Sequence, residues 1–201
     1  LSIVEEYLAG LSVSDNVIAP LPALIDRVDL PDRENWRKLV DRPLEAIAEH
    51  RLEKVVLARE TEFHFETEDM LDPISLLRHL LPHTTHSYEF CFHPSASRAF
   101  LGASPERLFH RNNVYLQSEA VAGTRPRGDS DAADEALGNA LLGSDKDLRE
   151  HRFVVRTLRN HFQRFCMATN HDPAPSLMRL RNCQHLHTYM EGILKHHDVD
   201  A

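Results

Sequence analysis

Hydrophobic residues along the chain recur with two different periods, which predicts a mixture of helices and strands. Between residues 34 and 51 the apolar side chains fall at helical spacing, so we expect an amphipathic helix there. Residues 54–65 are rich in Val, Thr and Phe with partial alternation, and they predict a strand. Three further short strands are predicted at residues 86–92, 98–101 and 114–121.

The remaining pattern adds helices and turns. Asn-rich residues 111–113 predict a hairpin turn, because Asn tolerates left-handed geometry. Other elements are expected as a helix at 74–81, a polar loop at 127–133, helices at 135–142 and 144–167, and strand or mixed structure at 177–194. Hairpins and an uneven alternation of helix and strand favour an α+β fold, with largely antiparallel sheets flanked by helices.

Composition restricts the functional class. The 201 residues suffice for one sizeable domain, and 31 acidic against 23 basic side chains give a net charge of −8, which disfavours a nucleic-acid partner. No apolar run approaches the ~20 residues of a membrane span. Cys91, Cys166 and Cys183 are sparse and form no C-x-x-C pair, so we expect reduced thiols and a cytoplasmic protein.

Lys54 is the first candidate for chemistry. It begins an apolar, β-branched run, and desolvation among such neighbours disfavours an ammonium group. A neutral lysine is a competent general base. The alternative is an edge-strand lysine that stays in solvent and discourages aggregation.

Two polar positions follow turn-forming residues. Glu106 comes directly after Ser-Pro, which fixes the chain, and by itself it reads as a surface carboxylate. In the turn Ala122-Gly123-Thr124, glycine permits close approach of a ligand, and the Thr124 amide and hydroxyl can bind an oxygen atom. The alternative is a plain strand-end turn, followed by arginines at 125 and 127 that are solvated or form structural ion pairs.

Two carboxylates share one face of the long predicted helix. Asp147 and Glu150 are three residues apart, and hard oxygen ligands in this arrangement suit Mg²⁺. The alternative is helix capping, since Ser144 followed by Asp147 resembles a capping box. Further along, His185 shares a strand face with His187, and by itself it reads as a packed or exposed strand histidine.

Four blocks in order resemble the chorismate-utilising enzyme family, which includes isochorismate, anthranilate, aminodeoxychorismate and salicylate synthases. The blocks are K-V-V-L-A-R at 54–59, G-A-S-P-E-R-L at 102–108, S-E-A-V-A-G-T-R-P-R-G at 118–128 and D-K-D-L-R-E-H at 145–151. The similarity spans roughly residues 50–190. It implies the partial fold of that family, with Lys54 as the water-activating base and Glu106 as the acid that protonates the departing hydroxyl.

The resemblance also implies a binding site. It assigns Ala122, Gly123 and Thr124 to the carboxylate of chorismate, and His185 to the neighbourhood of its ring. The family pattern K-E-x-x-E-H has Asp in place of its first Glu here, so Glu150 is the stronger Mg²⁺ ligand, with Asp147 as the second.

Two positions distinguish the family members. Anthranilate synthases usually carry Gln where Lys54 stands, and aminodeoxychorismate synthases often carry Lys where Ala122 stands, so water is the expected nucleophile. The chain is most similar to a menaquinone-type isochorismate synthase. A salicylate synthase, or an enzyme like anthranilate synthase, is the alternative within the family.

After the matched region, the chain does not continue into the motifs that follow in family members. We therefore expect a chain truncated at both ends, with 1–201 a single incomplete domain whose C-terminal half is absent. The alternative of another class is an inactive fragment that acts as a binding or interaction module, with self-association through the bare surface. Chorismate is the expected small-molecule partner, with neither nucleic acid nor membrane.

Overall fold

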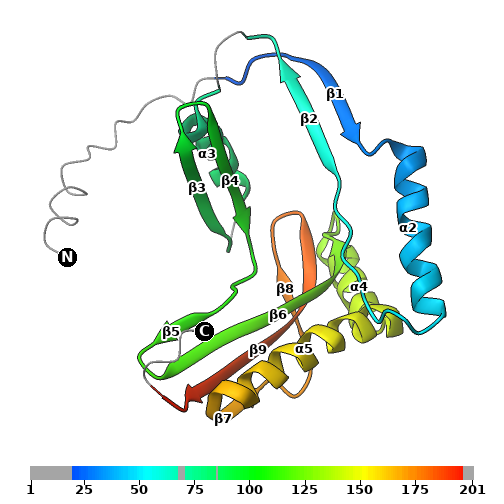
Figure 1. The fold of residues 1–201 in the computed structure, drawn as a ribbon, viewed down its shortest axis with the longest axis vertical. Coiled ribbons are helices and arrows are strands. Elements are labelled where there is room, and N and C mark those ends of the chain that lie inside the picture. Colours follow the sequence, from blue (N-terminus) through cyan, green and yellow to red (C-terminus); the bar gives the residue numbers. More distant parts are fainter. Residues whose placement is uncertain (1–19, 68–70, 85, 197–201) are drawn as a thin grey trace, which may run out of the picture.

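The computed structural model describes residues 20–67, 71–84 and 86–196 (Figure 1). Every strand pair in these ranges is antiparallel. The strands form two separate two-stranded sheets and one five-stranded sheet, with helices interspersed along the chain. The predicted α+β class with antiparallel sheets is therefore confirmed.

The first two-stranded sheet pairs β1 (Leu24–Leu30) with β2 (Glu60–Phe65), and α2 (Arg33–Ala48) lies between them in sequence. The helix begins where predicted, because the Asp32 side chain accepts a hydrogen bond from the Asn35 amide. The strand predicted from residue 54 is wrong over residues 54–59, which run outside any strand. Strand β1 ends at Leu30, which pairs with Glu60, because Pro31 and the Asp32 helix cap follow. No residue of β1 therefore remains to pair with 54–59.

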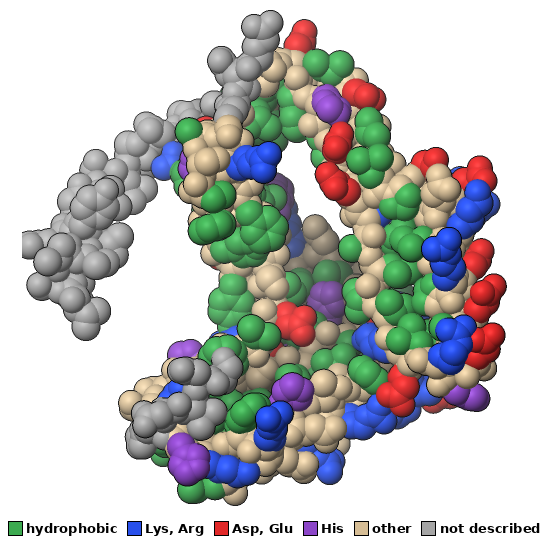
Figure 2. Space-filling model, viewed as in Figure 1, with side chains coloured by type: hydrophobic (Ala, Val, Ile, Leu, Met, Phe, Trp, Pro, Cys, Tyr) green, Lys and Arg blue, Asp and Glu red, His purple; other side chains and the backbone are tan. Residues whose placement is uncertain are grey.

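The second two-stranded sheet is the hairpin of β3 (Tyr88–Ser95) and β4 (Arg98–Ser104). It is preceded by α3 (Pro73–Leu80), which confirms the helix predicted at 74–81, and by the short 3₁₀ helix η1 (Leu81–His83). Large apolar side chains gather on this hairpin and remain in contact with solvent (Figure 2). Phe92 and Phe100 are 65% and 67% exposed, so the hairpin contributes no buried core among the described residues.

The five-stranded sheet carries the core. Its order is β5 (His110–Asn112), β6 (Tyr115–Pro126), β9 (Cys183–Leu194) and β7 (Cys166–His171), and β8 (Ser176–Arg179) also pairs with β9. The predicted turn at 111–113 is confirmed, because Asn113 adopts a left-handed φ of 55° between β5 and β6.

Helices α4 (Asp131–Leu142) and α5 (Asp145–Phe165) cover one face of this sheet (Figure 1). The apolar core between α5 and the sheet comprises Leu116, Phe162, Cys166, Met190 and Leu194.

Several boundaries differ from the sequence prediction: α2 ends at Ala48 and not near 51, and β4 and β6 extend to Ser104 and Pro126. Helix α4 begins four residues early, because the Ser130 side chain caps it by accepting from the Ala133 amide. The helix expected to reach 167 ends at Phe165, and Cys166 starts β7 in pairing with β9.

No helix within the described ranges is long and apolar enough to cross a membrane. The three cysteines at 91, 166 and 183 are free thiols, as their spacing predicts.

Candidate active site

The five-stranded sheet has one face covered by helices and one open face. Along β9 every even-numbered residue from Gln184 to Leu194 is buried, whereas the odd-numbered residues are at least partly accessible. Strand alternation therefore sends His185, His187 and Tyr189 to the open face. On β6 the same alternation places Glu119 and its odd-numbered neighbours there.

A β-bulge at Gly123 changes this alternation within β6. The pairing shifts from Ala122 opposite Leu186 to Thr124 opposite His185, and Gly123 adopts a φ of +78°. The extra residue brings Thr124 to the open face, where its Oγ1 lies 3.0 Å from Nδ1 of His185. The structure thus brings together two of the predicted binding residues.

The other two residues of the predicted turn contribute differently. Ala122 stands opposite Leu186, which is fully buried, so its side chain belongs to the helix-covered face and only its backbone borders the open one. A Cβ on Gly123 would lie 3.2 Å from Cβ of Asp147 and 3.3 Å from Cδ1 of Leu186. The positive φ and the limited space both favour glycine here.

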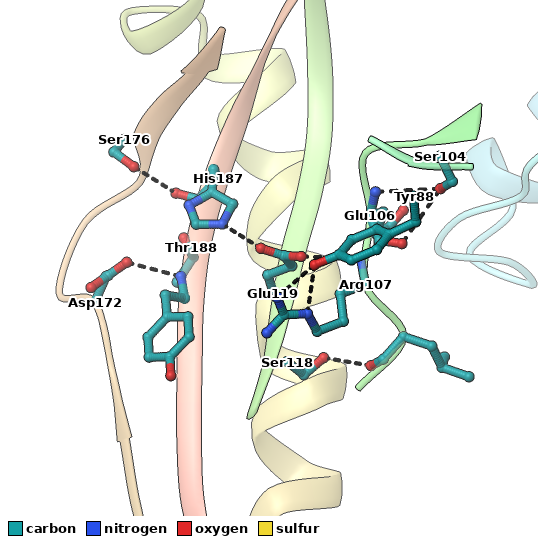
Figure 3. A network of polar contacts seen from close by, with 12 residues as sticks. Tyr88, Ser104, Glu106, Arg107, Ser118, Glu119, Asp172, Ser176, His187 and Thr188 are labelled. Carbon is teal, nitrogen blue, oxygen red and sulfur yellow. Dashed lines mark hydrogen bonds and ion pairs between the residues drawn. The ribbon is translucent and has the colours of Figure 1, made fainter. Parts of the chain in front are cut away.

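Glu106 lies beside the free edge of β6. Its backbone N–H donates to Oγ of Ser104 at 3.3 Å, as a Ser-Pro-Glu turn allows (Figure 3). Although the residue is exposed as a whole, partial burial of its carboxyl raises the pKa of Glu106, and the nearby charge of Glu119 raises it further. Lys54 and the backbone of Val121 act in the opposite direction. A raised carboxyl pKa favours the protonated form that a general acid needs.

Lys54 lies in the segment that leads to β2 and reaches α5. Its Nζ is 3.3 Å from Oε1 of Glu150, and its side chain is 18% exposed. The predicted base therefore contacts one predicted metal ligand, and its positive charge is felt at Glu106. This placement differs from an edge-strand lysine in solvent, because residues 54–59 form no strand and the side chain is largely covered.

Asp147 is engaged in an ion pair rather than open to solvent. Its Oδ2 lies 2.7 Å from Nη2 of Arg125, and its side chain is only 7% exposed. Hydrogen bonding from Ser144 and then the charge of Arg125 lower the pKa of Asp147 against the effect of its burial. The expectation that Arg125 forms a structural ion pair is confirmed, and so is the capping of α5 by Ser144.

The donor set for a metal is small. No group of three or more His, Cys, Asp or Glu side chains is arranged to hold a metal within the described parts of the chain. Glu150 fits as one ligand, since its carboxylate is 43% exposed and already attracts a cation. Asp147 is paired with Arg125 in this structure, so its role as a metal ligand stays a prediction.

Sequence reasoning passed over Glu119. Its Oε2 lies 2.9 Å from Nε2 of His187, and its Oε1 accepts from the backbone N–H of Arg107 at 3.1 Å (Figure 3). The alternation of β6 could have placed Glu119 on the open face. Its hydrogen-bond partners could not be inferred in this way, because they lie 12 and 68 residues away in sequence. The Arg107 side chain bonds in turn to the Tyr88 hydroxyl through Nε at 2.8 Å.

Comparison with known proteins agrees with this fold. The chorismate binding enzyme family matches residues 5–200, and the chain belongs to this family. It is 34% identical over 178 residues to the chloroplastic isochorismate synthase of Catharanthus roseus, covering 88% of this chain and 30% of that protein.

Solved structures give the same picture. One is a Bacillus anthracis protein assigned as a 2,3-dihydroxybenzoate-specific isochorismate synthase, with a TM-score of 0.82 and 32% identity over 91% of this chain and 50% of that one. Another is the menaquinone-specific isochorismate synthase of Escherichia coli, with a TM-score of 0.79 and 31% identity over 96% and 45% of the two chains. The chain thus spans half or less of the length of these relatives.

Proposed function

We infer that the natural protein carrying this chain is an isochorismate synthase, which isomerises chorismate by adding water at C2 and releasing the C4 hydroxyl. The observation that carries this inference is that Lys54 and Glu106, from distant segments, lie near enough for the charge of Lys54 to lower the pKa of Glu106, while Lys54 Nζ lies 3.3 Å from Glu150 Oε1. Thr124 and His185 meet on the open face of the five-stranded sheet. Relatives at 31–34% identity that are named as isochorismate synthases support it.

Lys54 and Glu106 carry the two proton transfers. Lys54 takes a proton from water as the water oxygen bonds to C2, and the ring double bonds shift. The C4–O bond then breaks, and Glu106 gives its proton to the departing hydroxyl, which leaves as water. Atoms and charge balance without any oxidant or reductant, and each proton-transfer group contributes about 10²–10⁴ in rate.

Thr124 and its surroundings are suited to hold a substrate carboxylate. Gly123 has no side chain, so a ligand can approach the backbone at the bulge. The Thr124 hydroxyl can donate to a substrate oxygen when it does not donate to Nδ1 of His185. His185 lies beside this position and borders the substrate ring in our proposal.

Glu150 is the residue we propose to hold Mg²⁺, with Asp147 on the same helix face as the second candidate. Bound there, the ion would supply positive charge for the substrate carboxylate. The Lys54–Glu150 ion pair keeps both side chains at the same end of the site.

The test uses the natural protein at full length and variants Lys54→Ala and Glu106→Gln. Both should lower the conversion of chorismate at least 100-fold, because each removes a proton-transfer group. Lys38→Ala serves as the matched control, since Lys38 is an exposed helix residue that pairs with the exposed Glu34 one turn before it. Reaction in H₂¹⁸O should place one ¹⁸O atom in the product.

The same assay separates the alternatives. Salicylate as the product would indicate a salicylate synthase, and aminated products from ammonia would indicate an enzyme like anthranilate synthase. Full activity of Lys54→Ala would refute the assigned base. Failure of the full-length protein to consume chorismate would favour a binding module.

A further inference from the structure

Glu119 uses both carboxylate oxygens to join parts of the site that are far apart in sequence. Oε1 accepts from the backbone N–H of Arg107 at 3.1 Å, and Oε2 lies 2.9 Å from Nε2 of His187 (Figure 3). A carboxylate only accepts hydrogen bonds, so the His187 nitrogen is the donor. With side-chain exposures of 14% and 18%, Glu119 and His187 form a mostly covered pair on the open face.

The contact with Arg107 bears directly on Glu106. The N–H that Glu119 binds belongs to the peptide bond between Glu106 and Arg107. At the next residue, the carbonyl of Leu108 accepts a hydrogen bond from the hydroxyl of Ser118 at 2.8 Å. Strand β6 therefore holds the backbone after Glu106 at two points, which limits how far its carboxyl can move.

The charge on Glu119 affects the same carboxyl. After partial burial, the negative charge of Glu119 is the next largest cause that raises the pKa of Glu106. Two nearby carboxylates in different environments commonly separate into a protonated and an ionised member. Other charged or titratable groups around the pair are Lys54, Arg107, His187 and Tyr189.

We propose that Glu119, anchored by His187, is a positioning residue for Glu106: it fixes the peptide bond that follows Glu106 and holds a negative charge beside it. The proposal rests on the proposed function for the statement that Glu106 is the acid. The geometric part stands on the contacts of Glu119 alone.

Two variants separate the contact from the charge. Glu119→Gln keeps an oxygen at the same reach but removes the charge. Glu119→Asp keeps the charge but is shorter by one methylene group, so it loses the Arg107 amide. Glu191→Gln is the matched control, because Glu191 lies on the neighbouring strand β9, is exposed, and among the described residues bonds with Asn170 and Tyr189.

The first measurement needs no activity. In the 201-residue chain with ¹³C-labelled glutamate, the Glu106 carboxyl is identified by its loss in Glu106→Gln and titrated by NMR. Its midpoint should move to lower pH in Glu119→Gln and stay in place in Glu191→Gln. An unchanged midpoint in Glu119→Gln, or an equal shift in the control, would overturn the charge part of the proposal.

The second measurement follows kcat and KM against pH in the natural protein at full length. Activity should fall at high pH as Glu106 loses its proton, and Glu119→Gln should move this limb to lower pH with little change in KM. Glu119→Asp should lower kcat about tenfold, a fraction of a whole acid's contribution, and leave the limb in place. A merely structural role would alter stability without moving the limb.

His187 gives a rescue test. His187→Gln retains an N–H donor for Glu119 and should keep kcat within about threefold, whereas His187→Ala should reproduce the loss of Glu119→Asp. Equal loss in both variants would contradict the anchoring role. If the wild-type protein does not turn over chorismate, the proposed function fails, and the NMR titration still decides whether Glu119 controls Glu106.

Discussion

Replacing Gly123 by alanine tests whether the β-bulge depends on glycine at this position. Gly123 has a φ of +78°, a conformation that disfavours an L side chain by roughly 1–2 kcal/mol. An added Cβ would also lie 3.2 Å from Cβ of Asp147, 3.3 Å from Cδ1 of Leu186 and 3.4 Å from Cδ1 of Leu141. Overpacking of this kind adds about 1–3 kcal/mol, and the lower entropy of the unfolded alanine chain offsets about 0.4–1 kcal/mol.

We therefore expect Gly123→Ala to lower the free energy of unfolding by about 2–4 kcal/mol, or the melting temperature by roughly 5–15 °C. Urea unfolding followed by circular dichroism measures the difference. Gly143→Ala is the control, because Gly143 has a φ of −91° and an added Cβ would meet only the Asn139 carbonyl, at 3.3 Å. If Gly123→Ala were no more destabilised than this control, the bulge would not depend on glycine.

Two ion pairs give further predictions. Hydrogen bonds from Arg127 hold the pKa of Asp134 at about 2, below the ordinary value of 3.8, so the stabilisation is complete above about pH 4 and is lost as the pH falls through 2. The urea midpoint of Asp134→Asn should thus lie below wild type at pH 7, and the difference should shrink as the pH falls toward and through 2; a constant difference would contradict the linkage. Arg125→Ala should destabilise by about 2 kcal/mol, less than the 3–5 of fully buried pairs because Arg125 is 34% exposed. Removing Asp147 as well should restore part of the loss, and thermal unfolding of the single and double variants checks this.

The sequence predicts elements whose pattern is set locally. Helix α2 follows from its apolar spacing and its Asp cap, and the β5–β6 turn follows from its asparagines. Residues 54–59 have the composition of a strand, but a strand also needs an edge to pair with, and β1 ends before reaching them. Conversely β7, with mostly exposed side chains, is a strand because β9 pairs with it.

The same limit applies to the site. The Ser-Pro-Glu turn and the Ala-Gly-Thr turn are visible as motifs, so Glu106 and Thr124 could be selected from sequence. Their contacts could not, because these depend on tertiary register: His185 was also a predicted site residue, but its contact with Thr124 spans 61 residues of sequence. Likewise the alternation of β6 places Glu119 on a face, but only the docking of the 106–108 segment turns that position into a contact with the acid.

The bulge at Gly123 connects the two faces of the sheet. One extra residue brings Thr124 to the open face beside His185, and it sends the next residue, Arg125, to the helix-covered face opposite Gln184. There Nη2 of Arg125 pairs with the buried carboxylate of Asp147 at 2.7 Å. Because the ion pair on the covered side and the Thr124–His185 contact on the open side depend on the same register shift, a change that removes the bulge must disturb both. The folding core therefore fixes the geometry of the residues to which we assign substrate binding.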